Sequence, residues 1–196
     1  MYTRILVPVD GSSFSEQLVE PASQIAGAGG AELALMRVVE RPDDMAQGER
    51  YVQALAGPFG AKSLCVPMPA DGAAAAIVDE AQRVPGTLVA ICSHGRSGAM
   101  QALFGSVALQ VLRSLGEPAV VFRPYTDGPS APAKVARVVL PLDGSEVSEA
   151  IVPQAAGLAK WLGARLVVVS VLEPSARPDD AGFDASWEID LFGGRR

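Results

Sequence analysis

The residues best suited to hold an anion form a loop of small and polar side chains, residues 93–98. This loop follows an apolar run at residues 88–92, which is typical of a buried strand, and it leads to Gly105 and Ser106, where a segment with helical apolar spacing begins. Gly116 and Pro118 end that segment, and residues 119–122 form the next apolar run. A strand, a glycine-containing loop and a helix start in this order direct backbone N–H groups towards an anion.

Catalytic chemistry has little support in the sequence. His94 is the only histidine, and no metal-ligating residues stand around it at suitable spacing, so we expect it to be a loop residue. Arg96 is expected either to meet the anion or to be solvated. The chain has no Walker lysine, no G-x-S-x-G elbow and no carboxylate pair with evident metal-ligand spacing, and the apolar flank of Cys92 disfavours a catalytic thiolate. We therefore expect binding without fast turnover.

Composition limits the class of protein and its partners. Of the 196 residues, 49% are hydrophobic and 19% are charged, which allows a sizeable core. A net charge of −6 disfavours a nucleic-acid polymer or an anionic membrane as partner. The two cysteines make no disulfide framework, and no export signal or membrane-length apolar run is evident. These features predict a cytoplasmic location.

Apolar runs alternate with helical patterns along the first two thirds of the chain. Strands are expected at residues 2–9, 32–39, 63–67, 88–92 and 119–122, and helices at 15–28, 46–55, 73–84 and from 106 onwards. Prolines at the end of the third strand indicate a sheet edge. Five strands alternating with four helices predict an α/β fold with a parallel sheet and helices on both faces.

An internal repeat divides the chain. Residues 4–40 align without gaps on residues 137–173, an offset of 137 − 4 = 133 residues, and the motif PxDGS at residues 8–12 returns at 141–145. Because the turn chemistry is kept, duplication is the better explanation. We predict a complete domain at residues 1–125, a linker at 126–134, a partial repeat at 135–173 and a tail at 174–196.

The second copy lacks a third strand and a glycine loop. Because two parallel strands cannot cover their own apolar surface, we expect this copy either to dock on the first domain or to pair with another chain. Truncation of a longer tandem protein is an open alternative. The tail offers possible apolar anchors, namely Phe183, Trp187, Ile189, Leu191 and Phe192.

These features resemble the universal stress protein family, whose phosphate-binding signature is G-x-x-G, nine residues and G-[S/T]. Gly95, nine residues and Gly105-Ser106 match this signature, whereas Cys92 stands at the position of its first glycine. The resemblance covers residues 2–124 as a whole unit and 135–173 as a partial one. It implies an open five-stranded parallel sheet, Rossmann-like, with strand order 3-2-1-4-5 and ATP at the point where that order reverses, where ligands of open α/β sheets generally bind.

The resemblance also implies a set of nucleotide-binding residues, namely Pro8, Asp10, Val38, Cys92, His94, Gly95, Arg96, Gly105, Ser106 and Val107. Asp10 would hold a ribose hydroxyl, or it would only cap the next helix or shape the turn, a structural role that is expected for Asp143. Val38 would offer backbone groups to adenine, or it would simply fill a buried strand. The glycines would permit positive φ and close approach, and Ser106 would cap the helix.

Three functions remain open at this point. The leading hypothesis is a cytosolic stress-response protein that binds ATP or AMP, with or without magnesium, and signals through dimer contacts. The second is a dimerisation or interaction module without nucleotide binding. The missing half-site in the second copy favours it, and so does Cys92 if its position needs positive φ or close approach of the ligand. A slow ATPase or nucleotide-transferring enzyme is the third. The exposed edge of the last strand, residues 118–123, predicts a homodimer.

Overall fold

The computed structural model describes residues 1–93, 105–123 and 135–170. The chain divides into two compact units, Tyr2–Pro132 and Ala133–Arg196 together with Met1. Elements of the first unit, in chain order, are β1 (Arg4–Val9), α1 (Ser13–Glu16), α2 (Val19–Gly29), β2 (Glu32–Val39), η1 (Pro42–Asp44), α3 (Met45–Ala56), η2 (Gly57–Phe59), β3 (Lys62–Pro67), α4 (Ala73–Arg83), β4 (Thr87–Cys92), α5 (Ser106–Ser114) and β5 (Ala119–Phe122). The second unit contains β6 (Arg137–Leu142), α6 (Glu146–Glu149), α7 (Val152–Leu162) and β7 (Arg165–Ser170).

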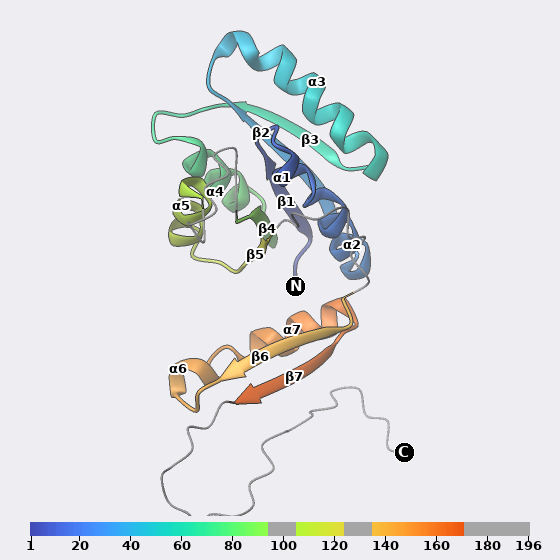
Figure 1. Ribbon diagram of the computed structural model, residues 1–196, viewed down its shortest axis with the longest axis vertical. Coiled ribbons are helices and arrows are strands. Elements are labelled where there is room, and N and C mark those ends of the chain that lie inside the picture. Colours follow the sequence, from blue (N-terminus) through green and yellow to red (C-terminus); the bar gives the residue numbers. More distant parts are fainter. Residues whose placement is uncertain (94–104, 124–134, 171–196) are drawn as a thin grey trace, which may run out of the picture. The chain divides into compact units, whose positions relative to one another are not determined.

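A parallel sheet with strand order β3-β2-β1-β4-β5 forms the centre of the first unit (Figure 1). This order confirms the predicted fold class, and β3 lies at the edge that its prolines predicted. All six residues of β4 are buried, as expected for a continuous apolar run between two helical layers. The strand order reverses between β1 and β4, so the carboxyl ends of these two strands mark the switch point.

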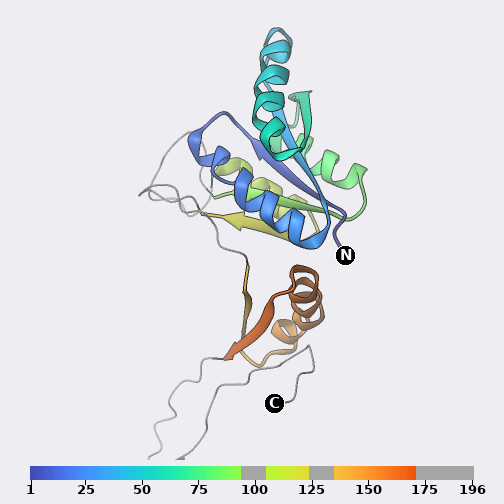
Figure 2. The same cartoon turned by 90° about the vertical axis from the view of Figure 1, so that its right-hand side faces the viewer.

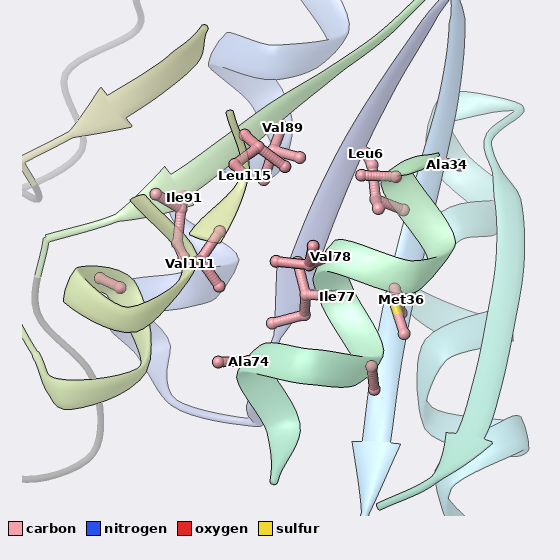
Figure 3. Packing of buried hydrophobic residues seen from close by; sticks show 13 residues of the cluster. Leu6, Ala34, Met36, Ala74, Ile77, Val78, Val89, Ile91, Val111 and Leu115 are labelled. Carbon is pink, nitrogen blue, oxygen red and sulfur yellow. The ribbon is translucent and has the colours of Figure 1, made fainter. Parts of the chain in front are cut away.

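Helices cover both faces of this sheet. On one face, Ile77 of α4 and Val111 of α5 are buried against Leu6 and Ile91 of the strands (Figure 3). The helices α1, α2 and α3 cover the opposite face, since α2 packs on β1 and β2 while α3 packs on β2 and β3. Burial of each such large apolar side chain contributes about 1.5–3 kcal/mol to folding, so these two layers account for much of the driving force.

The helix predicted at residues 15–28 is in fact two helices, because α1 ends at Glu16 and α2 begins at Val19. Pro21 explains the break. It has no N–H to donate to the carbonyl of Gln17, and its ring would clash with that carbonyl in a continuous helix. The second unit repeats the break between α6 and α7, where Pro153 stands in the first turn of α7.

In the second unit, β6 and β7 pair in parallel, and α7 packs along one face of the two strands (Figure 2). The register pairs Arg137 with Arg165, which is the pairing of Arg4 with Glu32 moved by 133 residues. The face opposite α7 differs between the copies: Val139 is 60% exposed, whereas its counterpart Leu6 is fully buried. The described part of the second unit therefore lacks the layer that α4 and α5 supply in the first.

Candidate functional site

A cavity of about 730 Å³ opens at the carboxyl ends of β1, β2 and β4 in the first unit. Its size suits a small organic ligand. The described members of the predicted site all line it, namely Pro8, Asp10, Val38, Cys92, Gly105, Ser106 and Val107. The remaining predicted residues, His94, Gly95 and Arg96, lie outside the described residues.

The amino-terminal end of α5 forms one wall of the cavity. Gly105 precedes the helix, and its N–H donates a hydrogen bond to the carbonyl of Ser93 (2.7 Å), while its own carbonyl accepts one from Leu109 (3.0 Å). The N–H groups of Ser106 and Val107 follow in the first turn of α5, where the helix itself has no backbone carbonyl to accept their hydrogen bonds. This end of α5 carries partial positive charge at the cavity wall, which favours an anion.

Two expectations about this wall were wrong. Gly105 has φ −67° and ψ 156°, an extended conformation that any residue can adopt, so positive φ is not the reason for a glycine here. Ser106 does not cap the helix, because it is the first residue of α5 and Gly105 occupies the capping position without a side chain. Because Gly105 lines the cavity and has no side chain, it leaves more space there for a ligand than another residue would.

Asp10 organises the turn between β1 and α1. Its Oδ1 accepts hydrogen bonds from the N–H and the Oγ of Ser12 (3.0 and 2.6 Å) and from the Oγ of Ser15 (2.7 Å). Gly11 adopts φ 82°, a region that favours glycine, and the Oγ of Ser12 accepts from the N–H of Ser15 to cap α1 (3.2 Å). The turn-shaping role considered for Asp10 is therefore confirmed, whereas Ser12 and not Asp10 caps α1. The contact of Asp10 with a ribose stays a prediction.

The second copy repeats this turn. Oδ1 of Asp143 accepts from the N–H of Ser145 (2.9 Å), and Gly144 has φ 80°. Hydrogen bonds from Ser148 and Ser145 lower the pKa of the Asp143 carboxyl to about 2. The same Asp-Gly-Ser chemistry therefore builds both turns, and the structural role expected for Asp143 is confirmed.

Cys92 is an ordinary strand residue. It ends β4, pairs with Phe122 of β5, and has a negative φ like every described residue other than glycine. Its side chain is 7% exposed, and its Sγ lies 3.5 Å from the carbonyl oxygen of Phe14. Because cysteine adopts this backbone without strain, the replacement of the family's glycine does not distort the end of β4.

Apolar residues form the part of the cavity next to α4. Val38 and Val39 continue β2 past its pairing with β1 and pair there with Val66 and Pro67 of β3. Val38 packs against the core cluster that includes Ile77 of α4, and both line the cavity. This surface suits the flat apolar face of a base.

Sequence reasoning missed the wall formed by α3. Tyr51 of α3 and Arg37 of β2 line the cavity, and the guanidinium carbon of Arg37 lies 5.9 Å from the centre of the Tyr51 ring. The hydroxyl of Tyr51 donates to Oε1 of Glu16 (2.8 Å), and burial together with this bond raises the pKa of the phenol. No sequence motif indicated that Glu16, Arg37 and Tyr51 lie together, because they come from three elements that only the fold brings close.

Within residues 1–93, 105–123 and 135–170, no group of three or more histidine, cysteine, aspartate or glutamate side chains could hold a metal ion. In the same part of the chain, no helix has the length and apolarity needed to cross a membrane.

The fold and the position of the cavity agree with a family-level sequence match. The model of the universal stress protein family matches residues 1–58, 70–123 and 134–193. The chain belongs to the universal stress protein family. Its third matched segment lies in the second copy, so both copies are of universal stress protein type, as their repeat predicted. No curated protein sequence matches the chain at a significant level.

Solved universal stress protein structures share the fold. One from Archaeoglobus fulgidus has 21% identity and a TM-score of 0.51, covering 62% of this chain and 98% of its own. A universal stress protein solved in complex with cAMP has 25% identity and a TM-score of 0.51, covering 63% and 98%. A putative universal stress protein from Pseudomonas aeruginosa UCBPP-PA14 has 20% identity and a TM-score of 0.60, covering 86% of this chain and 61% of its own.

Proposed function

We propose that this universal stress protein binds an adenine nucleotide in the cavity at the switch point. The main support for this proposal is that the first turn of α5, including Ser106 and Val107, lines this cavity beside the carboxyl ends of β1 and β4. A phosphate group fits there because a helix start supplies N–H donors and partial positive charge. The structure of the similar protein in complex with cAMP supports an adenine nucleotide as the ligand class.

The remaining parts of a nucleotide have matching surfaces in the same cavity. The base would lie against the apolar surface of Val38 and Ile77, and the ribose would lie near Asp10. ATP and AMP are both candidates, and magnesium would be held through the phosphates of ATP. The negative φ of Cys92 removes one argument for a family member without nucleotide binding, and the other argument, a need for close approach of the ligand at this position, stays open. A signalling role in the stress response and a cytoplasmic location stay predictions from the sequence.

Calorimetric titration with ATP and with AMP, at fixed salt and magnesium, tests this proposal. Gly105→Val fills space at a cavity-lining residue whose extended backbone valine adopts readily, so we expect nucleotide affinity to fall while the fold is kept. The matched control is Gly57→Val, at a residue that lies outside the cavity lining and has open surroundings. Absence of binding to either nucleotide would refute the proposal and favour an interaction module.

We also propose that the protein is a homodimer paired through β5. This strand lies at the edge of the sheet, and Val121 on it is 39% exposed. Sedimentation velocity should show a dimer that Val121→Lys converts to a monomer. A concentration-independent monomer in the unaltered protein would contradict this assembly.

We propose that the chain is divided into domains as its sequence repeat predicts. Residues 1–125 would form the nucleotide-binding domain and residues 135–173 the partial second repeat, as the separate sheets β3-β2-β1-β4-β5 and β6-β7 support. The proposed linker, residues 126–134, and the tail, residues 174–196, lie outside the described residues. Limited proteolysis that cuts first within residues 126–134 would support this boundary, and a first cut within 1–125 would contradict it.

A further inference from the structure

The guanidinium of Arg37 lies at the carboxyl end of β1, one of the two strands that mark the switch point. Arg37 is paired with Val9 in the β1–β2 register, and its Nη1 donates a hydrogen bond to the carbonyl oxygen of Val9 at 3.3 Å. Val9 is the last residue of β1, next to Asp10. The positive charge of Arg37 is therefore at the carboxyl end of β1, and α5 begins beside the carboxyl end of the adjacent strand β4.

This cation has no acidic partner among the described residues. The ion pairs there join other side chains, and Arg37 is in none of them. It is half-buried and lines the cavity, where the other described charged residues are all acidic, namely Asp10, Glu40 and Asp44. A partly desolvated guanidinium is stabilised by an anion that accepts its remaining N–H groups, and phosphate matches that planar fork.

The packing of α3 against β2 fixes the position of Arg37. The ring of Tyr51 packs beside the guanidinium, and the bond from Tyr51 to Glu16 anchors that ring. Gly48 brings α3 close to β2, because a Cβ at Gly48 would lie 2.7 Å from Cγ1 of Val39. The cation is thus held at the cavity wall before any ligand binds, which lowers the entropic cost of using it.

We propose that Arg37 is a specificity-determining residue that contacts the phosphate of the bound nucleotide, with Tyr51 as its positioning residue. This inference rests on the proposed nucleotide site and adds a second phosphate contact in the cavity that the start of α5 also lines. It predicts that Arg37, together with the start of α5, allows the cavity to distinguish a nucleotide from its uncharged nucleoside.

Calorimetric titrations of AMP and of adenosine into the full chain test this inference. Arg37→Met keeps most of the side-chain length while removing the charge, and we expect AMP affinity to fall about tenfold or more, as for a lost charged hydrogen bond. Adenosine affinity should change less than about twofold, since a neutral ligand does not use that bond. Arg50→Met is the matched control, because it makes the same charge change on the exposed side of α3, outside the cavity.

Arg37→Lys keeps the charge without the planar fork, so its AMP affinity should lie between those of the unaltered protein and Arg37→Met. Tyr51→Phe removes the bond to Glu16 and should weaken AMP more than adenosine. Equal loss of both ligands in Arg37→Met, or no loss of either, would overturn the role of Arg37 while leaving the nucleotide site intact. Failure of the unaltered protein to bind AMP and adenosine would overturn the nucleotide site itself.

Discussion

Gly48 in the interior of α3 offers a test in which two known effects have opposite signs. Helix propensity alone predicts that Gly48→Ala stabilises the protein by about 1 kcal/mol. A Cβ at this position would, however, lie 2.7 Å from both the Sγ of Cys65 and Cγ1 of Val39. Val39 is 4% exposed in β2, and its β-branched side chain has few alternative rotamers, so it cannot move away cheaply.

Overpacking of this kind costs about 1–3 kcal/mol, which exceeds the gain from helix propensity. We therefore expect Gly48→Ala to destabilise the protein by about 1 kcal/mol. Gly27→Ala is the matched control, since Gly27 is inside α2 and has no atom within 4 Å of its Cβ position. That substitution should stabilise by about 0.5–1 kcal/mol.

Urea unfolding followed by far-ultraviolet circular dichroism measures both effects. With a slope of about 2 kcal/mol per molar urea, the two midpoints should move in opposite directions by about half a molar unit or less. Equal stabilisation by Gly48→Ala and Gly27→Ala would refute the close packing of α3 on β2. That result would also weaken the account of the cavity wall that α3 forms.

Further predictions concern the core, the second unit and two charged groups. Leu6→Ala should cost about 3–5 kcal/mol in urea unfolding because Leu6 is fully buried, whereas Val139→Ala, at the equivalent position, should cost less than about 1 kcal/mol. A large cost for Val139→Ala would mean that another surface covers this face in solution. Arg4→Met should destabilise by about 1–3 kcal/mol, since it removes the hydrogen bonds of a buried guanidinium to Glu80 and Thr87, while Glu80 stays paired with Arg83. A thermal midpoint within 1 °C of the unaltered protein, a shift of only about 0.2 kcal/mol, would contradict this. Carbon-detected NMR should give Asp143 a pKa of about 2, so its hydrogen bonds stabilise the folded state fully above about pH 4, and this contribution is lost as the pH falls through 2; an ordinary pKa near 3.8 would show that the turn is not formed.

The sequence predicted local structure correctly where residues close together in the chain determine it. The two Asp-Gly-Ser turns form as their composition predicts, because Asp10 and Asp143 bond to residues only two to five positions away. The strand order followed from the family resemblance alone, whereas the alternation of apolar runs with helical patterns predicted a parallel α/β sheet. Apolar runs such as residues 88–92 also identified the buried strands correctly.

Features that depend on distant residues were missed or misjudged. Tyr51 meets Glu16 across 35 residues, and Arg37 acquires its place only when β1 and β2 pair, so neither carries a sequence signal. The capping role expected for Ser106 was wrong because the helix begins at Ser106 itself, and helix boundaries are poorly defined by pattern alone. The continuous first helix was wrong because the effect of Pro21 on the preceding turn was overlooked.

The central claim is that a nucleotide phosphate binds at the start of α5. Amide NMR of the ¹⁵N-labelled chain during titration with AMP tests it most directly. The account predicts saturable shifts that are largest at Ser106, Val107 and Ala108, with further shifts at Val38. Saturable binding that leaves these amides unmoved, or no binding at all, would contradict it.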